Sequence, residues 1–295
     1  MYRFKRTALV FAAASVPTFA AAQSSTGSLP SADDKQWMLA LSALRDEDAY
    51  EHLLASLNLS LNEDTWFALH AGQSQAPSTE KDVSAGLLGI GVEHNLGRVG
   101  FGFDLEQWGD RNNLESTDWQ AEIFLRGDRY RVGWTYESRA IDIYFSGAGA
   151  PIATDLRKVG IDADGIAIDW RYRLMPNWQV YGAFADYDYP RALRIVPRAD
   201  RLDLLSTSAV TLAYGFVDSY RSVGIERAIG LKLVNLDLSQ DRSTIGGERL
   251  RSAAASILWP ASPRLDLEFR LGASRAAGFG SSVYGGVSIL IYGGG

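Results

Sequence analysis

The chain has 295 residues and a formal net charge of −6, with 35 acidic against 29 basic side chains. This balance lacks the positive excess that nucleic-acid binding requires, so we expect no nucleic-acid partner. The chain has no cysteine, which excludes disulfides, thiolate metal ligands and thiol catalysis. One alternating pattern runs from about residue 36 to the end, which predicts a single domain.

The start of the chain has the features of a secretory signal peptide. Three basic residues precede an apolar run that ends at Val16, and small residues follow up to Ala22. The run is shorter than the ~20 apolar residues of a membrane-spanning helix. We therefore predict a signal peptide at 1–22, whose loss would change the charge from −6 to −9 by removing three basic residues. A flexible leader at 23–34 would precede the domain at 35–295.

The repeating pattern is clearest between Gly165 and Tyr189. Large apolar residues alternate with charged or small ones up to Leu174, Met175-Pro176-Asn177 interrupts, and the alternation then resumes. A period of two on both sides of a tight turn predicts a β-hairpin. One face is apolar and aromatic, and the other carries an aspartate and two arginines where a soluble sandwich needs a dry core. A charged inside and an apolar outside indicate a strand whose outer solvent is lipid.

The same alternating pattern extends over the domain. It predicts an all-β fold, a transmembrane antiparallel up-and-down β-barrel of about 14 strands. The predicted strands are two within 35–61, then Thr65–Ser74, Val83–His94, Arg98–Trp108, Thr117–Arg126, Arg129–Phe145, Ile161–Leu174, Trp178–Tyr189, Leu204–Val217, Tyr220–Gln240, Glu248–Trp259, Arg264–Ser274 and Ser282–Tyr292.

Three segments leave alternatives open. The Leu-, Ala- and Glu-rich part of 35–61 also fits a helix, which would give a barrel of 12 strands with an N-terminal periplasmic helix. Arg129–Phe145 and Tyr220–Gln240 are long for strands, and their apolar residues change face part of the way along. A β-bulge near Ser138 and another near Leu233 would restore the facing, whereas an extra hairpin in each is the competing interpretation.

The predicted connections form two sets, as expected for an outer-membrane barrel with its short turns on the periplasmic side. Proline falls only in the predicted signal peptide, leader, turns and loops, which agrees with its exclusion from central strands. The tight turns are 62–64, 95–97, 127–128, 175–177, Asp218-Ser219 and 260–263. The longer loops are near 46–49, 75–82, 109–116, 146–160, 190–203, 241–247 and 275–281.

The last strand resembles the C-terminal assembly signal of Gram-negative outer-membrane β-barrel proteins, which are porin-like. That signal has a polar or aromatic residue, a glycine two positions on, and two large apolar residues one apart near the end. The matching residues are Tyr284, Gly286, Ile289, Ile291 and Tyr292. The resemblance implies a location in the outer membrane and contact with the barrel-assembly machinery.

If the large apolar residues face lipid, a mixed set of charges points into the lumen. These charges either pair to fill and stiffen the barrel or line a path for small hydrophilic solutes with opposed acidic and basic walls. The predicted lumen residues are Asp104, Glu106, Glu122, Arg126, Arg131, Glu137, Asp169, Arg171, Arg173, Asp266, Glu268 and Arg270.

The loop at 190–203 is rich in arginine. Folded inward it would form a constriction selective for anions, left outside it would contact lipopolysaccharide phosphates, and a plain solvated loop is the third possibility. The residues concerned are Arg191, Arg194, Arg198 and Arg201.

Catalysis is the least favoured class. Histidine is the usual general base, and the register expected across the turn at 62–64 places Ser56 beside His70 with Asn58 nearby. These residue types resemble those of an outer-membrane phospholipase, but the pair faces the lumen, so a chance neighbouring of common strand residues is favoured. With no phosphate loop or histidine cluster, we predict no cofactor and no metal. The sequence thus predicts a passive channel; the alternatives are a closed structural or adhesion barrel acting through its loops, and a lipid hydrolase.

Overall fold

The structure is a computed structural model. It describes residues 37–47, 50–76, 83–110, 114–145, 157–189, 217–244, 249–276 and 280–294. The predicted signal peptide and leader lie outside the described residues, as does most of the predicted strand Leu204–Val217.

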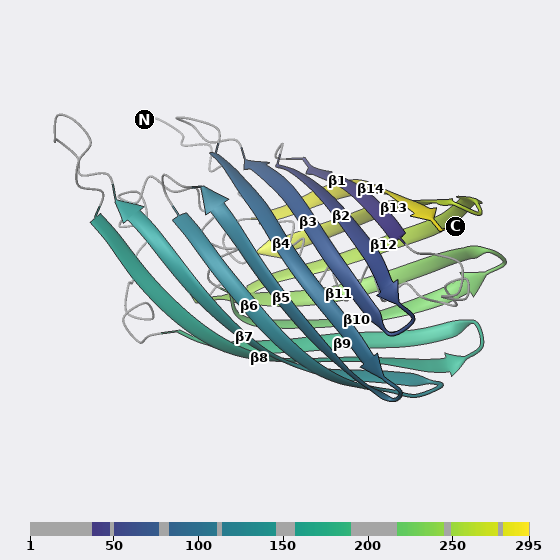
Figure 1. The fold of residues 1–295 in the computed structure, drawn as a ribbon. Helices are drawn as coiled ribbons and strands as arrows, with labels where there is room; N and C mark the ends of the chain where they lie inside the picture. Colours follow the sequence, from purple (N-terminus) through teal and green to yellow (C-terminus); the bar gives the residue numbers. More distant parts are fainter. Residues whose placement is uncertain are drawn as a thin grey trace.

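The described residues form one closed antiparallel barrel in which each strand pairs with its neighbours in the chain, and the first pairs with the last (Figure 1). The all-β barrel prediction is confirmed, including its count of 14 strands. The strands are β1 (Trp37–Asp46), β2 (Glu51–Asn62), β3 (Thr65–Ala76), β4 (Val83–Leu96), β5 (Val99–Asp110), β6 (Leu114–Arg126), β7 (Tyr130–Phe145), β8 (Arg157–Met175), β9 (Trp178–Asp188), β10 (Val217–Ile229), β11 (Lys232–Ser243), β12 (Arg249–Ser262), β13 (Leu265–Ala276) and β14 (Gly280–Gly293).

Two ends of the barrel are distinguished by their connections. The turn end has tight hairpins such as those at 63–64, 97–98 and 230–231, and it also contains the start of β1 and the end of β14. The loop end contains the opposite ends of the strands, which border the undescribed segments such as 77–82 and 190–216. Figure 1 shows the hairpins gathered at one end of the slanted strands.

The ambiguous N-terminal segment is strand rather than helix. β1 pairs with β14 from Trp37 opposite Gly293 to Asp46 opposite Tyr284, and it pairs with β2 on its other side. A helix at this position would leave β2 and β14 as open edges with unpaired backbone groups. The alternative of 12 strands with a periplasmic helix is therefore wrong.

The two long predicted strands have different outcomes. β7 is continuous, and its register with β6 and β8 is unbroken, so the predicted bulge near Ser138 is wrong. The apolar residue that suggested the bulge, Ile141, is 1% exposed and lies in an apolar cluster on the inner face.

The region predicted as Tyr220–Gln240 is a hairpin of β10 and β11, so the competing interpretation of an extra hairpin is confirmed here. Its turn is at Gly230, whose φ of 61° is in the left-handed region that glycine tolerates. The bulge near Leu233 and the turn at Asp218-Ser219 are both wrong, because the former residue begins a regular ladder and the latter pair lies within β10. The described barrel still has 14 strands because this hairpin supplies two strands where one was predicted, while the predicted strand Leu204–Val217 lies outside the described residues apart from Val217.

One proline departs from the expected exclusion. Pro260 lies inside β12, which extends to Ser262. Proline lacks a backbone donor, and the register of β12 with β13 shifts at this point, so the residue occupies an irregularity next to the turn.

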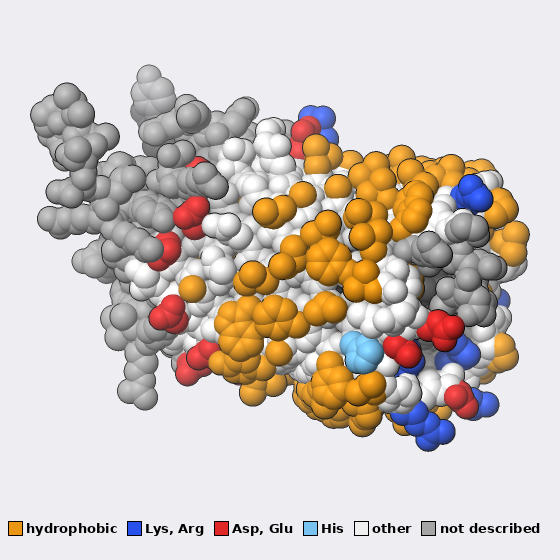
Figure 2. All heavy atoms as spheres, viewed as in Figure 1, with side chains coloured by type: hydrophobic (Ala, Val, Ile, Leu, Met, Phe, Trp, Pro, Cys, Tyr) orange, Lys and Arg blue, Asp and Glu red, His pale blue; other side chains and the backbone are white. Residues whose placement is uncertain are grey.

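The two faces of the barrel have opposite chemistry. On the outer face large apolar side chains are exposed, among them Ile90 at 43%, Trp134 at 42% and Leu238 at 59%. Figure 2 shows apolar side chains spread over the visible side, with charged groups gathered toward the ends. Such an outer face fits hydrocarbon as its solvent. Among the described residues, no helix is long and apolar enough to cross a membrane.

The outer face predicts a depth-dependent cost for charge. Leu105 lies in the middle of β5 and Leu61 lies next to the turn end of β2, and both are on the outer face and exposed. We expect Leu105→Arg to lower the free energy of unfolding from phospholipid vesicles by about 2–4 kcal/mol, and Leu61→Arg by about 0–1 kcal/mol. Denaturant titration of both variants measures the difference. Equal costs would show that the outer face does not contact hydrocarbon.

Candidate functional site on the inner face of the barrel

Strand register places every predicted lumen residue on one face of the sheet. Residues directly opposite in an antiparallel ladder share a face, and Glu106 lies opposite Asp118, Arg131 opposite Arg171, and Arg270 opposite Gly286. This inner face also carries the buried side chains Ala40 and His70. Arg126 and Arg173 lie at the exposed turn end, where Arg126 Nε donates to the Gly97 carbonyl at 3.0 Å. The inner face thus holds Asp104, Glu106, Glu122, Arg126, Arg131, Glu137, Asp169, Arg171, Arg173, Asp266, Glu268 and Arg270.

The sequence interpretation missed a second group of inner-face charges. Arg139 was lost because a bulge near Ser138 would turn it outward, whereas uninterrupted alternation along the strand would have found it. The missed residues are Asp46, Glu93, Asp110, Asp118, Arg139, Glu226, Asp237 and Asp241.

Arg131 joins carboxylates from the strands on both sides of β7. Its guanidinium donates to Asp169 Oδ2 and to Glu122 Oε1, each at 2.7 Å. Gly133 makes room for both acids, since a Cβ there would lie 2.3 Å from an oxygen of each. The guanidinium carbon also lies 4.3 Å from the centre of the Phe124 ring. One fixed cation therefore holds two anions, and the set keeps a net negative charge when all three are ionised.

A tyrosine crosses from β9 to β11 beside this set. Tyr181 donates its hydroxyl proton to Asp237 and passes over Gly224, where a Cβ would lie 2.3 Å from the ring. Arg171, the neighbour of Arg131 in the register, lies 5.9 Å from the Tyr181 ring centre. Polar and aromatic side chains thus continue around the inner wall from β6 to β11.

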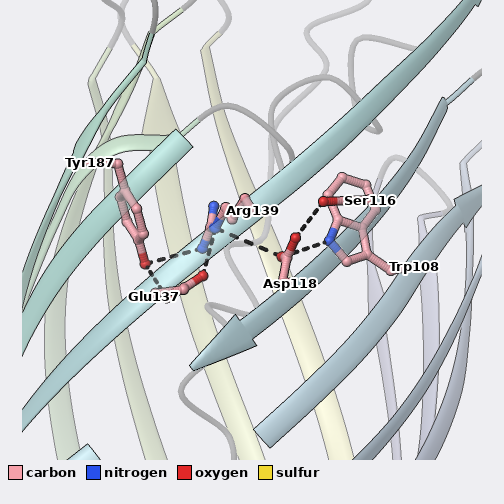
Figure 3. Close-up of polar contacts among 6 residues, drawn as sticks. All are labelled: Trp108, Ser116, Asp118, Glu137, Arg139 and Tyr187. Carbon is pink, nitrogen blue, oxygen red and sulfur yellow. Dashed lines mark hydrogen bonds and ion pairs between the residues drawn. The ribbon is translucent and has the colours of Figure 1, made fainter. Parts of the chain in front are cut away.

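The second set, which we call the Arg139 set, lies nearer the loop end, and its ion-paired side chains are about one-tenth exposed (Figure 3). Arg139 Nε donates to Glu137 Oε1 at 2.5 Å and lies 3.7 Å from Asp118 Oδ2. Asp118 also accepts from Trp108 Nε1 at 3.0 Å and from the Ser116 hydroxyl. Tyr187 donates to Glu137 Oε2 at 2.9 Å and its ring lies 4.1 Å from the Arg139 guanidinium carbon. These contacts bind β5, β6, β7 and β9 into one rigid wall.

His70 and Glu106 form a third buried pair. His70 Nε2 lies 2.7 Å from Glu106 Oε1, and the two side chains are 1% and 7% exposed. The imidazole lies over Gly89 on the strand between them, where a Cβ would be 1.9 Å from Nε2. Ser56 is opposite His70 in the register, as expected, and both residues are buried on the inner face. This places the serine and histidine away from the outer face where acyl chains would lie.

Two apolar clusters also lie on the inner face, one near each end. The loop-end cluster includes Ile141, Ile161 and Tyr187, while the turn-end cluster includes Leu258 and Leu290. Charged residues lie beside both clusters, since Arg139 is opposite Ala163 and Asp266 is opposite Leu290. The inner face is therefore a mixture of charged and apolar side chains rather than a uniformly charged tube.

Other predicted residues have simpler outcomes. The arginines of the 190–203 loop lie outside the described residues. The C-terminal motif lies in β14, where Tyr284 and Tyr292 are buried inward and Tyr292 donates to Asp266 Oδ2 at 2.8 Å. Among the described residues, no group of three or more histidine and carboxylate side chains is arranged to hold a metal ion.

The comparisons with known proteins identify a fold. No protein-family model matches the chain, and no curated protein does. The CymD monoaromatic hydrocarbon channel is similar at 11% identity, with 89% of each chain covered and a TM-score of 0.55. The Pseudomonas putida toluene transporter TodX is similar at 12% identity, with 88% of this chain and 89% of that chain covered and a TM-score of 0.51.

The structural neighbours are thus outer-membrane channels, and the predicted resemblance to porin-like outer-membrane β-barrels is confirmed at the level of fold. No particular subfamily is evident. At identities this low, the likeness is one of architecture.

The Arg139 set predicts a large cost for removing its cation. Arg139→Gln leaves Asp118 and Glu137 as neighbouring buried carboxylates with side chains about one-tenth exposed. We expect the free energy of unfolding to fall by about 3 kcal/mol or more. Arg45→Gln, which breaks an exposed pair with Glu51, should cost about 0–1 kcal/mol.

A triple variant provides the internal check on that result. Adding Asp118→Asn and Glu137→Gln to Arg139→Gln removes the unpaired charges, so most of the lost stability should return. Denaturant unfolding of the folded barrel measures all four proteins. A triple variant as unstable as Arg139→Gln would show that the Arg139 set stabilises the barrel through packing and not through charge pairing.

The Gly89 contact predicts a position-specific effect of one methyl group. Gly89→Ala must displace the His70 ring and break its pair with Glu106, so we expect a loss of about 1–3 kcal/mol in unfolding free energy. Gly86 is on the outer face of the same strand with no atom within 4 Å of a Cβ. Gly86→Ala should be neutral or stabilise by up to about 1 kcal/mol. Denaturant unfolding compares the two variants. Equal changes in unfolding free energy would contradict the conclusion that Gly89 makes room for the His70 ring.

Proposed function

We propose that the protein is a passive channel for small hydrophilic solutes in the bacterial outer membrane. The closed barrel supplies an apolar exterior and an inner face bearing ionised side chains, which is the arrangement of a water-filled path across lipid. The neighbours with the same architecture, a monoaromatic hydrocarbon channel and a toluene transporter, support passage of small molecules as the general role.

The orientation follows from the two ends of the barrel. The tight turns would lie on the periplasmic side and the longer connections outside, because chains of this class reach the membrane from the periplasm. The predicted signal peptide at 1–22 would export the chain, and the β14 motif would engage the barrel-assembly machinery. Both roles are part of the proposal.

The charge of the inner face supports a preference for cations. Inward carboxylates outnumber inward arginines, and the paired sets do not cancel the excess, since Arg131 and Arg139 each hold two carboxylates. Asp104 and Glu226 add acidic groups elsewhere on the wall. A net negative lining concentrates cations and repels anions at short range. This excess of inward carboxylates is the observation that carries the proposal.

A closed structural barrel is the second candidate, and a specific observation favours it. The Arg139 set and the apolar clusters are tightly buried on the inner face, as expected where side chains fill a lumen. A barrel of this kind would act through its loops. It differs from a channel in one measurable property, because it would conduct no ions.

Planar-bilayer recording tests both candidates. We expect single-channel conductance and, in a KCl gradient, a reversal potential that shows preference for K⁺ over Cl⁻. Asp104→Asn removes one inward charge and should lower the K⁺/Cl⁻ permeability ratio while conductance persists. Asp186→Asn removes a charge from the exposed outer face and should leave the ratio unchanged.

The results of these recordings distinguish the channel from the closed barrel. A folded protein with no conductance at any voltage removes the channel and leaves the closed barrel. Conductance with Cl⁻ preferred over K⁺ removes the acidic path as the selective element. An equal change in the Asp104 and Asp186 variants would show that general surface charge, not the lining, sets the preference.

A further inference from the structure

The outer wall carries a patch of arginines at the loop end of β10 to β13. All are exposed, and all point away from the lumen because they alternate with inward residues such as Ser222 and Ser252. We call this group the arginine patch. It consists of Arg221, Arg242, Arg249, Arg251 and Arg275.

The register sets like charges directly opposite one another in this patch. Arg242 lies opposite Arg249, and Arg251 lies opposite Arg275. Side chains at such positions start about 5 Å apart, and like charges there are destabilising. An anion bound between these arginines would relieve their repulsion.

Among the described residues, one carboxylate contacts an arginine of the patch. Asp218 Oδ2 lies 3.5 Å from Arg242 Nε. Arg251 donates to the neutral Gln240 Oε1 at 3.2 Å, and Arg221 lies over the Phe184 ring at 5.3 Å. The patch therefore keeps a positive excess with several guanidinium donors facing outward.

Apolar rows lie directly below the patch on the same face. Two residues further toward the turn end, about 7 Å along the strands, the wall carries small and branched apolar side chains. A second apolar row follows at the same interval. The first row is Val223, Leu238, Ala253, Ala273 and Val283, and the second contains Ile225, Leu236, Ala255 and Leu271.

The opposite wall has the reverse charge. On the outer face of β6 to β9 acidic residues face each other near the loop end, with Glu115 opposite Asp142 and Asp164 opposite Asp188. Figure 2 shows acidic side chains at that end of the visible side, beside apolar side chains. An anionic molecule outside the barrel would therefore be directed to β10–β13 and repelled from β6–β9.

We propose that the arginine patch binds the phosphate groups of an outer-leaflet glycolipid, whose acyl chains lie on the two apolar rows. The guanidinium forks match phosphate oxygens in bidentate geometry. The small side chains of Ala253 and Ala273 leave space against the outer face of the barrel for an acyl chain. A free phosphate would use the arginines but not the apolar rows, so the combination favours a lipid. The inference shares only the membrane setting with the proposed channel and requires no open lumen.

The test uses the purified folded barrel in detergent and a bisphosphorylated lipid A as the probe. Native mass spectrometry measures binding to the wild type, to Arg251→Gln/Arg275→Gln, and to the control Arg129→Gln/Arg264→Gln, which removes two exposed arginines at the turn end. We expect the patch variant to bind at least about tenfold more weakly and the control to bind as the wild type does. Dephosphorylated lipid A should also bind at least about tenfold more weakly to the wild type, and millimolar inorganic phosphate should not displace the intact lipid.

A second measurement remains informative if lipid binding is hard to quantify. Without lipid, Arg275→Gln relieves the repulsion with Arg251 and should raise the denaturant midpoint slightly. With lipid A present the order should reverse, because the wild type gains more from the ligand. Equal lipid affinity in patch and control variants, equal binding of the dephosphorylated lipid, displacement by inorganic phosphate, or an unchanged order of midpoints would each overturn the proposal. Conductance is unaffected by any of these outcomes, so failure here leaves the channel proposal standing.

Discussion

The structure depends on pairing every strand edge, because lipid offers no hydrogen bonds to a bare backbone. The pairing of β1 with β14 meets this need by closing the sheet over ten residue pairs. Closure then gives each strand one face toward lipid and one toward the interior. A register slip of one residue would move Asp169 and Arg171 into hydrocarbon together with the other inner charges of β8, so the charge pattern itself fixes the register.

Inner-face glycines decide how the interior is packed. Large side chains on one strand lie over a glycine directly opposite on the next, as with Tyr187 over Gly165 and Tyr284 over Gly272. The missing Cβ lets a ring or imidazole reach the second strand away, as Tyr181 reaches Asp237 across Gly224. The polar sets are thus consequences of glycine placement as much as of charge. Each set ties three or more strands together without adding bulk at the crossing point.

Sequence alone yields the class of fold and the facing of most strands, including the common face of the twelve predicted lumen residues, because a period of two is read directly from alternating residues. It fails where a strand carries an apolar residue on its charged face, as Ile141 does, since periodicity cannot distinguish a small inner cluster from a bulge. It also leaves the hairpin at Gly230-Leu231 as the competing interpretation only, since the turn has no proline, asparagine or aspartate to mark it. The contacts of Arg139 with Tyr187 and of His70 with Glu106 join strands that are two apart in the barrel. They can be predicted only when the strand register is known.

Charge is distributed in two ways that serve different solvents. Inside, Arg131 and Arg139 each contact two carboxylates, and inward carboxylates outnumber inward arginines, so the excess charge of the inner face is acidic. Outside, arginines and carboxylates gather on opposite walls at the loop end, separated from the interior by the sheet. Because alternation alone places one strand's charges on either side, a single strand such as β11 contributes Asp237 to the lumen and Arg242 to the outer wall. Under the two proposals, solute selectivity and lipid affinity would therefore change through separate substitutions on the same strand.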